Sequence, residues 1–150
     1  MKKYICILAI ICLLLSLTGC VMTSYEDTNG EADYSLQTIT EENILQGMGS
    51  SSIMSSQMTV NNKTVFKAQT MSGVMELVEK RLAGQPLDLI VSCQINKGNA
   101  RLVLVIDGQI VHDFALQEAN QRFTLENVTG KVCLKLAGES AGYSVEIEFH

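Results

Sequence analysis

The sequence predicts an all-β protein, a small antiparallel β-sandwich over residues 63–150 that follows a processed leader and a flexible tether. Two observations lead to this fold class. From about Thr64 onward, short apolar runs are separated by turn residues, which is typical of sheets built from hairpins. The last run, from Tyr143 to Phe149, alternates apolar side chains with Ser and Glu without a break. Such alternation is expected of a strand with one buried face.

Residues 1–19 are predicted to be a signal peptide. Lys2 and Lys3 form a positively charged start, and the apolar run Tyr4–Leu17 follows them. This run is too short to span a bilayer as a helix, but it has the length of the apolar region of a signal peptide.

The tetrapeptide Leu17-Thr18-Gly19-Cys20 resembles the lipobox of bacterial lipoproteins. The small residues leave the backbone accessible to the lipoprotein signal peptidase, and the cysteine sulfur is the atom that carries the diacylglycerol. The resemblance implies cleavage between Gly19 and Cys20 and lipidation of Cys20. The alternative is an ordinary secretory signal that contains a cysteine by chance.

A lipidated Cys20 would attach the chain to the extracytoplasmic face of a bacterial membrane, because two acyl chains hold a protein durably. The membrane is therefore the first expected partner. The whole chain has a net charge of −5, and loss of Lys2 and Lys3 makes the mature charge −7. An acidic domain is repelled by anionic lipid and should project away from the membrane. The same acidity argues against nucleic acid as a partner, since nucleic-acid-binding proteins carry basic patches.

Residues 20–62 are predicted to be a lipidated N-terminus followed by a flexible, acidic and Ser-rich linker. Few large apolar residues occur there, and Gly47–Ser56 is close to low complexity. Such a composition buries too little apolar surface to offset the entropy of the chain. A short helix around Ile39–Leu45, with Thr40 as its N-cap, is the alternative within this segment.

Within the β domain, Leu87–Ile95 alternates after Pro86, which stands at a strand start where its missing N–H matters least. Residues 100–105 and 109–114 are predicted to form a hairpin. We favour a three-residue loop, Ile106–Gly108, over a two-residue loop. It would place Leu104 opposite Ile110, Leu102 opposite His112, Ala100 opposite Phe114, and Arg101 opposite Asp113.

Further along, Val132, Leu134 and Leu136 point to one face of a strand, and Lys131, Cys133 and Lys135 to the other. If this strand pairs with the one at 143–149, Lys131 can lie opposite Glu148. Residues 73–84 fit either a helical stripe or a strand face.

A second resemblance bears on this ambiguity. It rests on the segments Leu82-Ala83-Gly84-Gln85-Pro86-Leu87, Cys93–Gly98, Leu102–Gly108 and Ala137–Tyr143. Together they resemble small β-sandwich lipoproteins of Gram-positive bacteria over about residues 64–149. The resemblance implies a strand at 74–82. It supplies a fold and no function, because most such proteins are uncharacterised.

Cys93 and Cys133 remain after processing and lipidation, and a disulfide is common in this compartment. The strand faces predict otherwise. Cys93 lies on a core face with Val91 and Ile95, whereas Cys133 lies between two lysines. A disulfide needs Cβ atoms about 4 Å apart that point toward each other, so we expect two free thiols.

The sequence predicts no enzyme, no cofactor and no metal site. His112 and the terminal His150 are the only histidines, and the common catalytic motifs are absent. We expect His112 to be partly buried beside a backbone carbonyl. Glu146 and Glu148 share an exposed strand face, and the loops of Asp107 and Glu139 lack the dense oxygen ligands of a calcium site.

The chain is thus predicted to be a membrane-anchored lipoprotein of the cell envelope, a non-catalytic binding or interaction module with an envelope protein as a possible partner. The alternative is a carbohydrate-binding protein, or an accessory to an enzyme or transporter, that uses loop carboxylates and Tyr143.

The possible interaction surface consists of Val103, Val105 and Val111, three β-branched residues on the outer side of the predicted hairpin. Arg101 and Asp113 would form its rim. An exposed apolar patch of this kind often marks a docking site. The alternative is that a second layer, either the strand at 74–82 or the ordered end of the tether, covers these valines.

The lipobox makes a direct prediction. In the Cys20→Ala variant the signal peptidase has no lipidated cysteine to act on, so the precursor should remain uncleaved and unlabelled. Metabolic labelling with a radioactive fatty acid, followed by gel analysis, measures this. A labelled Cys20→Ala chain would contradict the lipobox.

Overall fold

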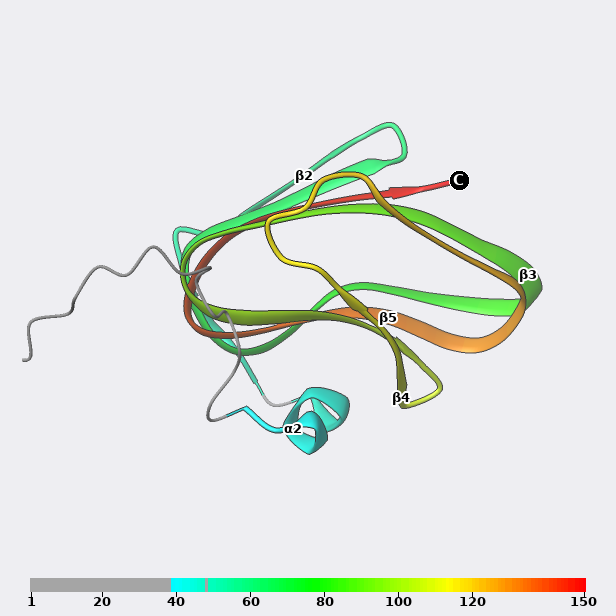
Figure 1. Ribbon diagram of the computed structural model, residues 1–150, viewed down its shortest axis with the longest axis horizontal. Coiled ribbons are helices and arrows are strands. Elements are labelled where there is room, and N and C mark those ends of the chain that lie inside the picture. The colour runs from blue at the N-terminus through cyan, green and yellow to red at the C-terminus, as the bar shows by residue number, and fades with distance from the viewer. Residues whose placement is uncertain (1–38, 48) are drawn as a thin grey trace, which may run out of the picture. The chain divides into compact units, whose positions relative to one another are not determined.

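The computed structural model describes residues 39–47 and 49–150, and these residues are all-β apart from one short helix (Figure 1). The elements in chain order are α2 (Glu41–Gln46), β1 (Ser51–Ile53), β2 (Ser56–Val60), β3 (Lys63–Ile106), β4 (Gln109–Phe114) and β5 (Gln121–Phe149). The strands form one antiparallel sheet of five strands. The all-β prediction is therefore confirmed. Within the described residues, no helix is long and apolar enough to cross a membrane.

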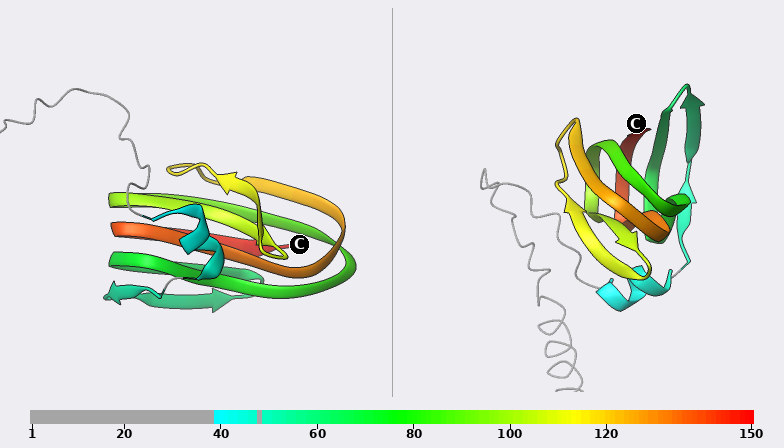
Figure 2. Two further views of the ribbon diagram at one scale, coloured as in Figure 1. Left: turned by 90° about the horizontal axis from the view of Figure 1, so that it is seen from below. Right: turned by 90° about the vertical axis from the view of Figure 1, so that its right-hand side faces the viewer.

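The sheet is folded over into two layers because β3 and β5 bend and pair with each other along most of their length (Figures 1 and 2). Each half of β5 lies between two stretches of β3. The first layer consists of β2, residues 63–68 of β3, residues 143–149 of β5, residues 89–95 of β3 and residues 121–125 of β5. The second layer consists of β1, residues 70–83 of β3, residues 129–139 of β5, residues 99–106 of β3 and β4.

The main core fills the space between the layers. Its largest fully buried side chains are Met71, Leu89, Val91, Leu102, Leu104, Leu136, Val145 and Ile147. Tyr143 joins them with 2% of its surface exposed. At one of the bends, Gly98 has a φ of +70°, and a Cβ there would lie 2.5 Å from the carbonyl oxygens of Glu139 and Ser140. Only glycine fits such a position, since its backbone adopts positive φ freely and has no Cβ.

A smaller apolar cluster lies on the outer side of the second layer, where α2 covers it (Figure 2). Ile44 of α2 is fully buried there against Val103, Val105 and Cys133. Thr40 caps the helix as the sequence suggested: its hydroxyl accepts from the N–H of Asn43 at 3.2 Å, and the Asn43 side chain accepts from the N–H of Thr40 at 3.3 Å.

Two cations attach α2 to the sheet. The Lys135 side chain, only 7% exposed, donates to the carbonyl oxygens of Ile44 at 2.9 Å and Leu45 at 2.8 Å. Carbonyl groups at the end of a helix are unpaired and carry partial negative charge, so a buried ammonium group is satisfied there. At the other end of the helix, Arg101 donates to Glu41 at 2.9 Å and to Asp113 at 2.6 Å.

These contacts correct the predicted tether. Residues 39–47 and 49–62 form α2, β1 and β2, and both strands pair with β3. The start of the folded domain at residue 63 was therefore placed too late. The composition of this segment is indeed poor in apolar residues, but backbone pairing, one buried isoleucine and the contacts of Lys135 and Arg101 attach it. Residues 20–38 of the predicted linker lie outside the described residues.

The predicted hairpin register is also wrong. Val105 pairs with Ile110 across the two-residue turn Asp107-Gly108, and a register shift between Leu104 and Val105 then changes the pairing. Leu104 lies opposite His112, and Leu102 opposite Phe114. The register shift leaves these side chains on their predicted faces of the sheet. Arg101 therefore still forms an ion pair with Asp113, but as its diagonal neighbour and not as the residue directly opposite.

Lys131 does not face Glu148. Residues 129–139 and 143–149 of β5 belong to different layers, and each pairs with β3 rather than with the other. Lys131 lies opposite Arg81 and forms ion pairs with Glu79 at 3.0 Å and Glu76 at 3.6 Å. The strand at 74–82, by contrast, is confirmed as part of β3.

Both cysteines are free and buried, as the strand faces predicted. Cys93 lies in the main core and Cys133 in the cluster under α2, on the other side of the second layer. Burial raises the pKa of the Cys93 thiol to about 12. Burial also raises the pKa of the Cys133 thiol.

We therefore expect both thiols to be unreactive in the folded chain at pH 8, since little thiolate forms and reagent has no access. Unfolding in urea without a reductant should make both react. Mass spectrometry after maleimide labelling of the lipidated chain measures the number of modified cysteines. If neither cysteine reacts in urea, a disulfide is present and the face assignment is wrong.

Candidate functional site

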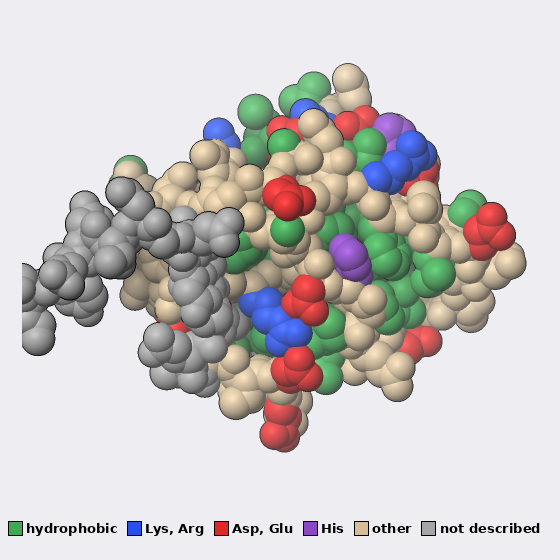
Figure 3. All heavy atoms as spheres, viewed as in Figure 1, with side chains coloured by type: hydrophobic (Ala, Val, Ile, Leu, Met, Phe, Trp, Pro, Cys, Tyr) green, Lys and Arg blue, Asp and Glu red, His purple; other side chains and the backbone are tan. Residues whose placement is uncertain are grey.

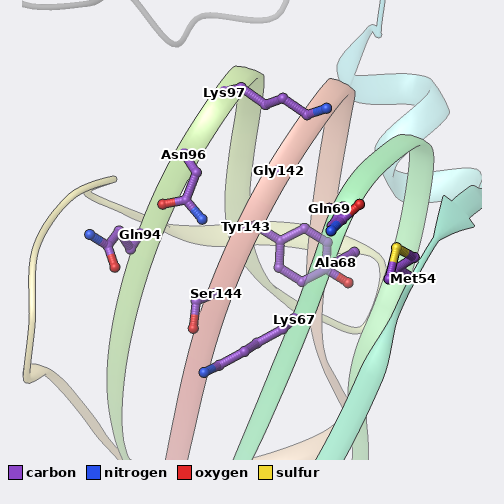
Figure 4. A pocket seen from close by; sticks show the side chains of 10 residues that line it. All are labelled: Met54, Lys67, Ala68, Gln69, Gln94, Asn96, Lys97, Gly142, Tyr143 and Ser144. Carbon is purple, nitrogen blue, oxygen red and sulfur yellow. The ribbon is translucent and has the colours of Figure 1, made fainter.

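A polar groove crosses the outer side of the first layer, and two neighbouring cavities form it. Its larger part is a cavity of about 560 Å³. Figure 4 shows the ten residues that line it: Met54, Lys67, Ala68, Gln69, Gln94, Asn96, Lys97, Gly142, Tyr143 and Ser144.

The alternation that builds the core also builds this groove. Lys67 and Gln69 lie on either side of the buried Ala68, so their side chains point outward from β3. Ser144 follows the same rule in β5, and Gln94 in the returning stretch of β3. Pairing then places Lys67, Ser144 and Gln94 in one row across three neighbouring strands.

Gly142 forms the floor of the groove at one end. A Cβ at this position would lie 2.8 Å from the carbonyl oxygen of Gln69 and 3.0 Å from Cγ of Lys97. The Lys97 side chain uses this space and lies across β5 at Gly142 (Figure 4). A larger residue here would displace the lysine, so the glycine sets the position of the charge.

A second cavity of about 360 Å³ continues the groove. It shares Gln94 and Ser144 with the first cavity and extends to Gln117, Glu118 and Glu146. The loop between β4 and β5 forms its wall. This loop is held by a hydrogen bond of 2.9 Å from the N–H of Cys93 to the carbonyl of Glu118. The N–H of Asn120 donates to the Ser92 hydroxyl, also at 2.9 Å.

The groove has a positive end and an acidic end. The part of the chain that the structure describes has six lysines, and four of them have a partner. Lys63 and Lys131 pair with glutamates, Lys135 with carbonyls, and Lys80 lies 3.5 Å above the Phe149 ring. Lys67 and Lys97 have no partner among the described residues, and both line the larger cavity. Glu118 and Glu146 lie at the other end, and Glu146 pairs with Lys63.

The groove offers hydrogen bonds and charge but no catalytic arrangement. Its amide and hydroxyl side chains both donate and accept hydrogen bonds. Cys93 borders the smaller cavity, but burial raises the pKa of its thiol to about 12, so it is not a nucleophile at neutral pH. Among the described residues, no three His, Cys, Asp or Glu side chains lie close enough to hold a metal ion. The groove thus presents hydrogen-bonding groups and two positive charges to a polar molecule.

The residues of the predicted interaction surface lie elsewhere. Val103 and Val105 are 0% and 3% exposed, so these two residues of the predicted interaction surface are buried and cannot contact a partner. The ordered end of the tether covers them, which is the alternative that the sequence left open. Val111 is 42% exposed. Gly19 and Cys20 lie outside the described residues.

The other candidates have structural roles. His112 lies against the rings of Phe114 and Phe123, with centroids 4.7 and 4.9 Å away. The Asp107 carboxylate accepts from the N–H of Lys131 at 2.7 Å and so ties a turn to β5. The Tyr143 ring lies in the core, so it provides no exposed aromatic surface for a sugar. That part of the carbohydrate alternative is wrong.

Sequence reasoning missed one exposed feature. The described residues include six exposed large hydrophobic side chains, and four of them fall in β1, β2 and their connection: Ile53, Met54, Met58 and Val60. Hydrophobic side chains protrude along the upper margin of the molecule over β2 (Figure 3). The low-complexity composition concealed them, although residues 49–62 have no charged residue.

The chain matches no protein-family model and no curated protein sequence. The candidate site therefore depends on geometry alone.

The cover over Val103 can be tested with a matched pair of substitutions. Val103→Lys places an unpaired charge under α2 and should lower the free energy of unfolding by about 3–5 kcal/mol. Val111→Lys adds the same charge at an exposed position and should change it by less than about 0.5 kcal/mol. Urea denaturation followed by circular dichroism measures both. Similar small losses would mean that α2 does not cover Val103 in solution.

Proposed function

We propose that this chain is a lipid-anchored lipoprotein of the bacterial cell envelope, and that its β domain is a non-catalytic binding module. Two features support the proposal. The Leu17–Cys20 tetrapeptide has the form of a lipobox, which would tether the chain to the extracytoplasmic face of the membrane through Cys20. The groove of the first layer is a polar surface whose lining has hydrogen-bonding groups and no catalytic arrangement.

The observation that carries the binding proposal is the position of Lys67 and Lys97. In an acidic chain, where the other described lysines have partners, these two line the same cavity together with three side-chain amides. An ammonium group gains most from an ionised partner, because charge-assisted hydrogen bonds are stronger than neutral ones. The ligand that fits best is an extended polar chain that carries carboxylate or phosphate groups.

The carbohydrate alternative survives in a restricted form. Amides and hydroxyls suit sugar hydroxyl groups, but Tyr143, the one aromatic residue that lines the groove, is buried and offers no stacking surface. Neutral sugar polymers commonly bind by stacking on exposed aromatic rings. An acidic glycan satisfies both the lysines and the amides, whereas a neutral glycan leaves the lysines unused.

A binding experiment tests this proposal with the lipidated chain in neutral phosphatidylcholine vesicles. Fluorescent polygalacturonate is the acidic probe, fluorescent dextran is the neutral probe, and flotation of the vesicles separates bound from free polymer. We expect polygalacturonate to bind and dextran not to bind. Binding should weaken as salt is raised from 50 to 500 mM, since exposed charges are screened.

The Lys67→Gln/Lys97→Gln double variant should weaken binding of the acidic polymer at least about tenfold, because two charged contacts are lost. The matched control is Lys80→Gln/Arg81→Gln, which removes the same charge from residues that do not line the groove. Equal losses in the two variants would show a non-specific charge effect. Binding of dextran as tight as that of polygalacturonate would contradict an acidic ligand.

A further inference from the structure

The outer edge of β2 is an unprotected sheet edge. Among the described residues, β2 pairs with β3 on one side only, so its other side presents free backbone N–H and C=O groups. Proteins usually protect such an edge with charged residues, prolines or bulges, because a free edge pairs readily with another strand. Residues 49–62 contain no charged residue and no proline.

The side chains on this edge add an apolar surface to the free backbone. Met58 is 62% exposed and Val60 is 57% exposed. Both lie on the outer side of the first layer, since they pair with Val65 and Lys63, which alternate with the buried Phe66. The edge therefore combines unpaired hydrogen-bonding groups with exposed methionine and valine side chains.

The turn between β2 and β3 determines which backbone groups are free. Val60 and Lys63 close the two-residue turn Asn61-Asn62, and the closing pair of such a hairpin is hydrogen-bonded. Alternation along the ladder then directs the N–H and C=O groups of Val60 and Met58 toward β3. Those of Gln57 and Thr59 point to the open side.

We propose that this edge binds the same edge of a second copy of the chain, with the two β2 strands antiparallel about a two-fold axis at Met58. Gln57 then pairs with the partner's Thr59, and Thr59 with the partner's Gln57. These are the residues whose backbone groups are free, so each pair exchanges two hydrogen bonds. Met58 meets the partner's Met58 at the axis, where the pair has no hydrogen bonds and the side chains approach closely.

Two observations favour a second copy over the strand of another protein. A two-fold contact requires the same strand to supply both halves of the interface, and pairing about Met58 brings the exposed Met58 and Val60 side chains of both copies together on one side of the sheet. In addition, the net charge of the chain is −5, so two copies repel over most of their surface. The uncharged segment 49–62 is a place where they can approach without that cost.

Cysteine cross-linking of the full chain in cell membranes tests the register. In Met58→Cys the two new thiols face each other across the axis at a Cα distance of about 4.5 Å, which suits a disulfide. Mild oxidation should give a disulfide-linked dimer of twice the chain mass on a non-reducing gel. The matched control is Val111→Cys, an exposed valine on β4, which should give at least about tenfold less dimer. The unmodified chain measures any background from its own cysteines.

Charge substitutions at the axis give a second readout that does not depend on oxidation. Met58→Lys and Met58→Glu should each lose self-association, because like charges meet at the axis. Co-expression of the two variants with different affinity tags should restore it as a mixed dimer. Circular dichroism controls for folding, since Met58 is exposed and neither variant should unfold the domain.

Three results would overturn the proposal: equal cross-linking at Val111→Cys, self-association that persists in Met58→Lys, or a Met58→Cys disulfide to a different protein. The proposal is independent of the groove and of the lipid anchor. Loss of polymer binding in the lysine variants therefore leaves the cross-linking result unchanged.

Discussion

The pairing of β5 with two stretches of β3 at once is the constraint on which the rest of the structure depends. Residues 143–149 have β3 on both sides in the first layer, and residues 129–139 have β3 on both sides in the second. The centre of each layer is thus made from chain segments far apart in the sequence. Shifting this register by one residue would move every core side chain to the surface. The same register sets the row of Lys67, Ser144 and Gln94, so the core and the groove are determined together.

The two layers differ in the side chains that the alternation of the strands places on their outer sides. On the first layer the outward residues that line the groove are mainly lysines, amides, hydroxyls and carboxylates, and they remain in water. On the second layer they include Val103, Val105 and Cys133, which must be covered. α2 provides the cover, and Lys135 fixes it through the last carbonyls of the helix. A lysine at the centre of an otherwise apolar face would be costly without those carbonyls. Lys135 therefore specifies where α2 must end.

The sequence was informative wherever a feature depends on local alternation. The strands, the free cysteines and the Arg101–Asp113 contact follow from which side chains share a face, and faces are conserved even when a bulge shifts the register. Thr40 was also recognisable as the N-cap of a short helix, in the alternative interpretation of the linker. The position of α2 was not, because Ile44 and the contacts with Lys135 and Arg101 attach it, and these contacts join residues about 60 to 90 apart in the sequence. Composition alone made that segment look like a linker.

The groove could not be predicted for a related reason. Lys67, Gln94 and Ser144 are ordinary outward residues of three separate runs, and nothing in any one run marks them. They become a site only after the folded sheet places them in a row. The exposed hydrophobic residues of β2 were hidden differently: they are few, and they occur among serines that suggested disorder. In both cases the signal lies in the tertiary pairing rather than in the residues.

The groove and the edge of β2 belong to the same layer, and this has a consequence for binding. Met54 lines the larger cavity and lies in the connection that leads into β2. In the two-fold pairing that we propose, the axis is perpendicular to the layer, so the outer sides of both copies face the same way. Two grooves would then open on one continuous surface. A polymer with repeated acidic groups could occupy both, and the second contact would occur at a high effective concentration. Weak binding by each shallow groove would then be enough for durable capture.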